Sequence, residues 1–178
     1  IEKCGGAEKF EARLDIFFDR GFFNVNNEPS FLSPCLYHWL GKPYRSSDRI
    51  HEIIAKNYND GPIGLPGNDD SGAMSSWLAF HMMGLYPNAG QNYYLINTPL
   101  LEETIFRLDN GKIFKISTQG LSDKNRYIQS VTLNGKTYPY SAIRHKDIIA
   151  GGELILKMGK KPSEWGKQLL LNEENEKL

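Results

Sequence analysis

Apolar residues in the first half of the chain recur every three or four positions, the period of an amphipathic helix. The pattern predicts a helix over residues 7–19, where Phe10, Leu14 and Phe17 share one face and Gly21 follows as a C-terminal cap. Three more helices are expected, over residues 29–40, from the capping pair Ser46 and Ser47 to Tyr58, and over residues 71–83. The first half is therefore expected to be an array of helices.

The period changes in the second half, where short β-branched and aromatic runs are separated by turn residues. Strands are expected over residues 93–97, 104–108, 113–118, 127–133 and 154–158. Asp109-Asn110-Gly111 and Asn134-Gly135 predict tight antiparallel hairpins. The fold class is therefore α+β, with a helical part over residues 1–90, an antiparallel β part over residues 91–178, and a charged tail over 172–178 that is expected to fray.

Composition and charge exclude several classes of protein. Among 178 residues, 40% are apolar and 21 basic side chains balance 21 acidic ones, so a core can form and no charge dominates the surface. The lysines at the end lack interleaved aromatics and are interpreted as a solvated face, so we expect no nucleic-acid partner. No apolar run is long enough to predict a membrane span. Cys4 and Cys35 could form a disulfide or remain two thiols, and the sequence leaves this open.

The residues with the clearest chemical potential lie in the turn from Gly64 to Gly72. Asp69 and Asp70 are adjacent there, flanked by glycines, directly before an apolar helix. Two interpretations stand side by side: an acidic N-terminal cap favoured by the helix dipole, and a pair of carboxylates presented for chemistry. In the second interpretation, Asp69 or Asp70 is a general base acting on water, which requires an acid partner elsewhere. No nucleophile elbow, phosphate-binding loop or paired-histidine metal motif accompanies them.

A second polar loop is expected beside this turn. In an antiparallel array of helices alternate loops lie at the same end, so Asn26, Asn27 and Glu28 should share one rim with Asn68, Asp69 and Asp70. Carboxylate and amide oxygens suit a hard cation such as Ca²⁺, or the hydroxyls of a sugar, and do not suit zinc. Glu28 could equally be a structural carboxylate at a helix start beside Pro29.

The run from Gly67 to Trp77, followed by Gly84-Leu85-Tyr86-Pro87, resembles the signature of the glycoside hydrolase family 92 α-mannosidases. Asn27-Glu28-Pro29-Ser30 and Leu40-Gly41-Lys42-Pro43-Tyr44 are similar to preceding segments of that family. Residues 127–136, His145-Lys146-Asp147-Ile148 and Gly151-Gly152-Glu153-Leu154 are similar to its C-terminal end. The resemblance covers nearly the whole chain in the right order.

The resemblance implies a calcium-dependent, inverting exo-α-mannosidase built from a β-sandwich and an (α/α)₆ toroid. The helical part would then be the last helices of the toroid, and the substrate terminal α-linked mannose, α-1,2 linkages included, on mannans or N-glycans. Asp70 would be the general base and Asp69 its support. Asn68, Asn27 and Trp77 would bind the sugar, and Glu28 and Asn26 would lie at the Ca²⁺ site. A secreted, periplasmic or cell-surface location is implied as well.

Two departures from the family pattern accompany the resemblance. Phe31 and Leu32 stand where many members carry two histidines, so support of the pocket is expected to differ. The family's general acid, a glutamate, lies before the segment matched here, and the chain opens on Ile1 in mid-pattern. We therefore expect a C-terminal portion that is inactive alone and needs the N-terminal part of the same protein. The alternative is a non-catalytic carbohydrate-binding or structural module.

Overall fold

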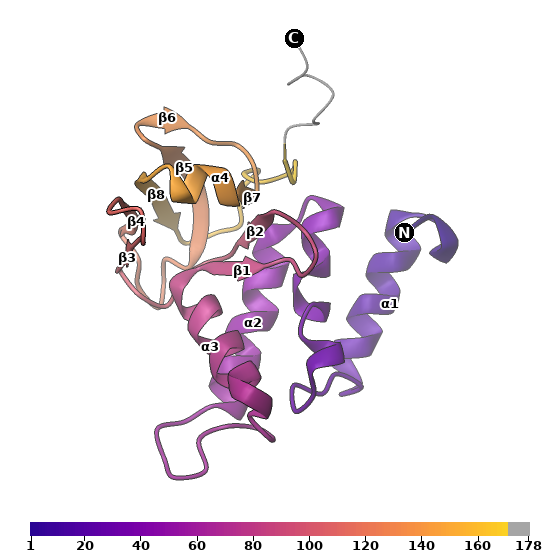
Figure 1. The fold of residues 1–178 in the computed structure, drawn as a ribbon. Helices are drawn as coiled ribbons and strands as arrows, with labels where there is room; N and C mark the ends of the chain where they lie inside the picture. Colours follow the sequence, from indigo (N-terminus) through magenta and orange to yellow (C-terminus); the bar gives the residue numbers. More distant parts are fainter. Residues whose placement is uncertain (171–178) are drawn as a thin grey trace.

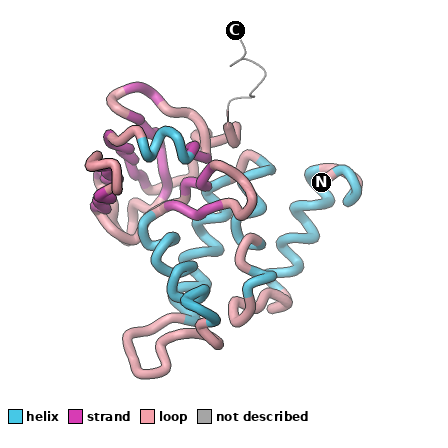
Figure 2. Tube along the Cα trace, viewed as in Figure 1, coloured by secondary structure: helices cyan, strands magenta, loops and turns pink. Residues whose placement is uncertain are grey.

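The structure, a computed structural model, describes residues 1–170. The predicted tail over 172–178 lies outside the described residues, as does the end of the predicted β part. Most helices gather on one side of the molecule, and the strands lie on the other together with one short helix (Figures 1 and 2). The expected α+β fold, a helical part followed by a β part, is confirmed.

The helical part contains three α-helices and several short 3₁₀ turns. Its elements are η1 (Glu2–Cys4), α1 (Ala7–Asp19), η2 (Glu28–Ser30), η3 (Ser33–Leu40), α2 (Pro43–Asn57), η4 (Asp70–Gly72) and α3 (Ala73–Met83). The single helix predicted over 29–40 is wrong, since that segment forms η2 and η3. Pro29 and Pro34 each lack an N–H, and a proline inside an α-helix removes a backbone hydrogen bond.

Helix α2 begins at Pro43, three residues before the predicted serine cap. Proline is well suited to the first helical position because its φ is already helical and its missing N–H would have no partner there. Ser46 and Ser47 are instead buried inside the helix. The Ser47 hydroxyl accepts a hydrogen bond from the backbone N–H of Thr98 at 3.0 Å, which ties α2 to the β part.

A five-stranded sheet in the order β3-β4-β8-β5-β6 forms most of the β part. Its strands are β3 (Glu103–Arg107), β4 (Ile113–Gln119), β5 (Tyr127–Leu133), β6 (Lys136–Thr137) and β8 (Gly152–Gly159). Both predicted hairpins are present, joining β3 to β4 and β5 to β6. The pairs are antiparallel apart from β4 and β8, which run parallel.

A smaller sheet lies between the two parts. It consists of β1 (Leu85–Pro87), β2 (Tyr93–Ile96) and β7 (Ala142–Arg144), and the short helix α4 (His145–Ile149) follows it. Successive side chains of a strand point to opposite faces. Leu95 and Ala142 accordingly belong to the apolar core of the helical part, whereas Ile96 and Ile143 belong to the core of the β part.

Each part has its own buried cluster. Trp77, Met74, Ile50 and Cys35 centre the helical core, and Phe114, Leu154 and Leu156 centre the β core. Cys35 is buried and Cys4 half-buried, and both are free thiols. Within residues 1–170 no helix is long and apolar enough to span a bilayer.

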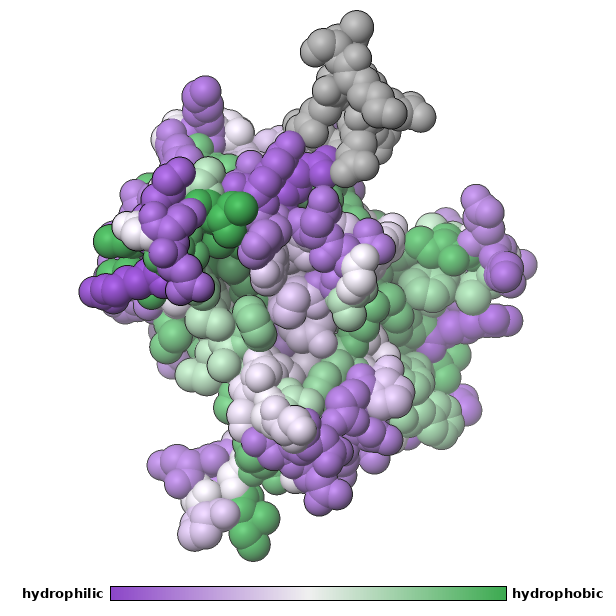
Figure 3. Space-filling model, in the orientation of Figure 1, coloured by the Kyte–Doolittle hydropathy of each residue, from purple (hydrophilic) through white to green (hydrophobic). Residues whose placement is uncertain are grey.

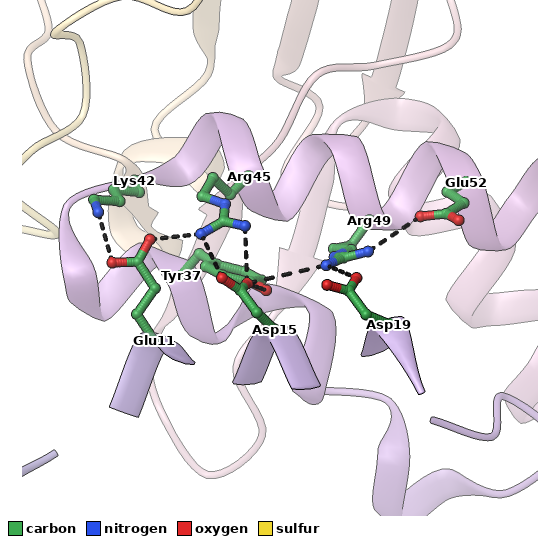
Figure 4. A network of polar contacts seen from close by, with 8 residues as sticks. All are labelled: Glu11, Asp15, Asp19, Tyr37, Lys42, Arg45, Arg49 and Glu52. Carbon is green, nitrogen blue, oxygen red and sulfur yellow. Dashed lines mark hydrogen bonds and ion pairs between the residues drawn. The ribbon is translucent and has the colours of Figure 1, made fainter. Parts of the chain in front are cut away.

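Helix α1 has one fully buried residue, Leu14, and contacts its neighbours through Phe18, which packs on the helical core, and through polar side chains. Acidic residues of α1 face basic residues at the start of α2 (Figure 4). Glu11 accepts hydrogen bonds from Lys42 and Arg45, each at 2.6 Å. Burial raises the pKa of Glu11, but these two cations outweigh burial and lower it overall. We call this set the α1–α2 ion ladder, formed by Glu11, Asp15, Asp19, Lys42, Arg45 and Arg49.

Two large apolar side chains in and just after α1 are exposed. Ile16 is 47% exposed, and Phe22, just after the helix, is 63% exposed. The space-filling view shows hydrophobic surface over the α1 region, beside the charged side chains of the same helix (Figure 3).

Candidate active site

The turn before α3 has an unusual backbone. Three consecutive residues, Asp70, Ser71 and Gly72, have positive φ values of 35°, 63° and 89°. A left-handed conformation costs an L-residue roughly 1–2 kcal/mol, and only glycine adopts it freely. Two non-glycine residues in this conformation are therefore strained, and such strain persists only where neighbouring contacts hold it, often at functional sites.

Asp69 supplies those contacts. Its carboxylate oxygen Oδ1 accepts from the backbone N–H of Ser75 at 2.8 Å, and Oδ2 accepts from the Ser75 hydroxyl at 2.9 Å. The Asp69 backbone carbonyl accepts from Ala73 N–H at 2.6 Å. The residue at the N-cap position of α3 is Gly72, which has no side chain to cap the helix. Asp69, three residues earlier, caps the first turn in its place.

Asp70 differs from Asp69 in exposure and in hydrogen bonding, two properties that affect the reactivity of a carboxylate. It is exposed, and among residues 1–170 it has no hydrogen-bond or ion-pair partner. Asp69 is half-buried, and donors occupy both of its oxygens. The left-handed turn therefore presents one free carboxylate beside one that is held in place.

The two polar loops expected to share a rim do meet. Gly67 lies so close to Asn26 that a Cβ atom on Gly67 would be 2.9 Å from the Asn26 backbone oxygen. Any side chain at position 67 would force the loops apart. In Figure 1 both loops lie at the lower end of the helical part, where α1 ends and α3 begins.

The candidate ligand residues around this rim are placed as follows. Glu28 is half-buried and opens η2, and its backbone N–H donates to the Asn27 side-chain oxygen at 3.1 Å. Asn26 is exposed, and its backbone N–H donates to the Asn24 side chain at 2.8 Å. Asn68 is exposed beside Asp69. Asn27 therefore has its amide oxygen engaged as a cap, which leaves its NH₂ group available.

Trp77 lies beneath the rim and not on its surface. It is 1% exposed, its indole N–H donates to the Phe31 carbonyl at 3.1 Å, and its ring stacks on Tyr58 at 5.8 Å. Phe31, one of the two residues that depart from the family pattern, is buried against Trp77. Trp77 therefore cannot contact a sugar directly in this structure. It supports the loop that carries Glu28, so any effect on sugar binding would be indirect.

The donors at the rim have the right chemistry for Ca²⁺ but are too few. Ca²⁺ takes six to eight oxygen ligands. Glu28 gives one carboxylate and the Asn26 loop gives amide and carbonyl oxygens, whereas Asp69 is already occupied by Ser75. The described part of the chain contains no group of three acidic, histidine or cysteine residues able to hold a metal ion. These residues alone therefore do not fit a complete Ca²⁺ site.

Sequence reasoning missed the role of Ser75. The alternating loops predicted the rim, and the adjacent aspartates predicted its chemistry, but a contact across six residues depends on the left-handed turn between them. The available signal was a serine at the third position of the helix, because the backbone N–H at that position is one that a capping side chain satisfies.

A cleft lies elsewhere on the molecule. It has a volume of about 400 Å³ and runs between α2 and the loops of the β part, with His51, Leu100 and Arg126 among its lining residues. No residue of the rim lines it, so we assign the site on chemistry and not on cavity size.

Comparisons with known proteins show the family. Residues 1–160 match the model of the glycosyl hydrolase family 92 catalytic domain. The chain belongs to glycosyl hydrolase family 92.

Its relatives are glycosidases. The chain is 45% identical over 169 residues to an uncharacterized secreted glycosidase of Arthroderma benhamiae, covering 93% of this chain and 22% of that protein. It superimposes on a family GH92 α-mannosidase of Bacteroides thetaiotaomicron, solved with mannoimidazole, with a TM-score of 0.84 and 33% identity over 89% of this chain and 23% of that one. An inverting family GH92 mannosidase of the same bacterium gives 0.84 and 28%, over 94% and 26%. The chain thus spans about a quarter of the length of these relatives.

Proposed function

We propose that this chain supplies the general-base side of an α-mannosidase active site, with Asp70 as the base. The Asp70 carboxylate takes a proton from a water molecule whose oxygen forms a bond to C1 of a terminal α-mannoside. The glycosidic bond breaks, and the leaving oxygen takes a proton from a general acid. Attack from the side opposite the leaving group inverts the anomeric configuration, as in other glycosidases with a base and an acid of this kind.

The observation that carries this proposal is the division between the two aspartates. A general base needs a free lone pair that can reach water, and of the two adjacent aspartates Asp70 is the one that is exposed and has no partner among the described residues. Asp69 holds the turn through Ser75. The strained left-handed backbone at Asp70 and Ser71 supports a functional role for this turn, since a cap alone does not require it.

We further propose that the chain by itself is not an active glycosidase. Inverting glycosidases use two carboxyl groups roughly 6.5–9.5 Å apart, with water between base and sugar. The residues at this rim supply a base, and the family resemblance places the acid glutamate before the matched segment. The greater length of the relatives is consistent with an acid from another part of the protein.

The substrate in this proposal is terminal α-linked mannose, with α-1,2 linkages on mannans or N-glycans as the first candidates. The exposed Asn68 amide and the free NH₂ of Asn27 would hydrogen-bond sugar hydroxyls, and Trp77 would support them from below. The name of the secreted relative favours a secreted, periplasmic or cell-surface location.

The direct test is Asp70→Asn in the full-length gene product, assayed for mannose release from α-1,2-mannobiose and from 4-nitrophenyl α-mannoside. Removing a general base should lower kcat by about 10²-fold or more, because such catalysis contributes 10²–10⁴. Asp60→Asn, an exposed carboxylate in the preceding loop, is the matched control and should keep full activity. NMR of the released sugar should show β-mannose first.

Two results would contradict the proposal. Activity of Asp70→Ala within a few-fold of the unmodified protein removes the base assignment. Mannose release by residues 1–178 alone, abolished by Asp70→Asn, removes the claim that this chain is inactive without a further part.

Calcium enters the proposal as a shared ligand. Glu28 and Asn26 would contribute oxygens to a Ca²⁺ ion whose remaining ligands come from outside this chain, and the bound ion would hold mannose hydroxyls. Chelation should then abolish activity of the full-length gene product, and Ca²⁺ should restore it. Isothermal titration with CaCl₂ should show weakened binding in Glu28→Gln. Unchanged binding in that variant would rule out Glu28 as a ligand.

The competing function is a non-catalytic carbohydrate-binding or structural module. One observation favours it: the Asp69 cap accounts for one of the two carboxylates without any chemistry. That function predicts mannoside binding by NMR titration with full activity in Asp70→Asn.

A further inference from the structure

We propose that Ser75 is a positioning residue, which reserves Asp69 for the turn and so leaves Asp70 as the free carboxylate of the adjacent pair. This inference rests on the proposed function of Asp70. It adds the reason why two adjacent, chemically identical side chains would have different roles.

The contact between Ser75 and Asp69 uses every suitable atom on both sides. The Ser75 N–H binds Oδ1 at 2.8 Å and the Ser75 hydroxyl binds Oδ2 at 2.9 Å, so each carboxylate oxygen has its own donor. Hydrogen bonds to an ionised acceptor are roughly twice as strong as neutral ones. A carboxylate held at both oxygens cannot turn toward the rim without losing both bonds.

The contact also encloses the strained residues. Asp69 and Ser75 bracket Asp70, Ser71 and Gly72, the three residues with positive φ. The bond from Ala73 N–H to the Asp69 carbonyl, at 2.6 Å, closes the same turn through the backbone. The Asp69–Ser75 contact and the backbone bond together fix the direction in which the Asp70 side chain points. Of these two, only the Asp69–Ser75 contact can be changed by substituting a side chain.

Loss of the Ser75 hydroxyl would free Oδ2 and leave the bond from the backbone N–H to Oδ1. Asp69 could then rotate about its side chain and would hold the turn around Asp70 less firmly. A less rigid turn would hold Asp70 in the attacking position for less of the time, which lowers kcat more than substrate affinity.

The experiment compares Ser75→Ala, Ser75→Thr and Ser76→Ala in the full-length gene product, with Asp70→Asn alongside. Ser76 is the next residue of the same helix, is exposed, and has no hydrogen-bond partner among the described side chains. Ser75→Ala should lower kcat about tenfold with KM within twofold. Ser75→Thr keeps the hydroxyl and should restore activity to within threefold, and Ser76→Ala should match the unmodified protein.

The outcomes separate the two claims. A Ser75→Ala variant as active as Ser76→Ala, beside an inactive Asp70→Asn, overturns the role of Ser75 and leaves Asp70 as base. Full activity in Asp70→Asn overturns the proposed function itself. A fall in kcat that Ser75→Thr does not restore, or that comes with an equal rise in KM, also overturns the positioning role. Circular dichroism melts of each variant identify any loss that comes from unfolding.

Discussion

The β core and the helical part keep their shape by different means. In the β core, buried Phe114, Leu154 and Leu156 are apolar and the backbone follows a regular strand register. The helical part buries His38 and His81, joins α1 to α2 through an ion ladder, and carries a strained turn at its rim. The β core contains no side chains that we assign to a reaction. The helical part combines its apolar core with polar contacts and a strained turn, and it is this part that presents a carboxylate for reaction.

The largest change in the free energy of unfolding is expected for a substitution in the β core. Phe114→Ala should lower the free energy of unfolding by about 3–5 kcal/mol, because it removes a fully buried aromatic ring and leaves a cavity. Urea titration followed by circular dichroism measures this. Ile113→Ala, at the neighbouring position that is 53% exposed, should cost less than about 1 kcal/mol. Equal losses at the two positions would mean that this strand is not packed as described.

Acid should destabilise the protein through two buried histidines of the helical part. Burial lowers the pKa of His38 to about 4 and that of His81 to about 3, and it outweighs the hydrogen bond with Asn97 that raises the pKa of His38. The unfolded chain therefore takes up protons near pH 6.5 while the folded protein does not, and stability falls as the pH drops through that value.

The histidine effect can be isolated by substitution. Between pH 7 and pH 5, each of these two histidines should cost about 2 kcal/mol of unfolding free energy. His81→Phe should remove roughly that amount of pH dependence, measured by urea unfolding at pH 7, 6 and 5. His145→Phe, at an exposed position, is the control. A pH dependence unchanged by His81→Phe would show that His81 is not buried in its neutral form.

The ion ladder should matter less than either core. Arg45→Met should cost about 1–2 kcal/mol, since it leaves Glu11, only 17% exposed, and Asp15 with fewer partners. The cost should shrink in 1 M NaCl because salt screens such pairs. Lys56→Met, an exposed i,i+4 pair with Glu52, should cost no more than about 0.5 kcal/mol. A salt-independent loss would point to packing of Arg45 over the Tyr37 ring instead.

The smallest effect, and the one of opposite sign, is expected at the rim. Ser71→Gly relieves a left-handed conformation, so the free energy of unfolding should stay constant or rise by about 0.5 kcal/mol. Ala79→Gly, at an exposed position inside α3, should instead cost about 1 kcal/mol. Differential scanning calorimetry distinguishes the two signs. A clear loss in Ser71→Gly would show that the backbone of this turn is unstrained.

Sequence reasoning succeeded where local signals were complete. Helix α1 and strand β5 have the predicted bounds, because Gly21 follows the first and Asn134-Gly135 ends the second. It failed over 29–40, where Pro34 interrupts an apolar pattern that looks helical. Strands β1 and β7 are three residues long, too short for a period of two to be recognised, and they depend on pairing with β2.

The candidate site was predictable in composition and not in conformation. Alternating helices placed Asn26 and Gly67 at the same end of the array, and the structure brings them into contact. Nothing local in Asp70 or Ser71 indicates a left-handed backbone, which glycine would normally supply. The left-handed backbone depends on contacts between Asp69 and the first residues of α3, which form only when the loop and the helix are both folded.

The sheet of β1, β2 and β7 has a consequence for how the molecule melts. One face of each strand contributes to the helical core and the other to the β core, so neither core can be exposed without removing a wall of the other. We expect one cooperative thermal transition, with equal calorimetric and van't Hoff enthalpies. A protease that cuts between β1 and β2 would accordingly release both halves from their folded state together.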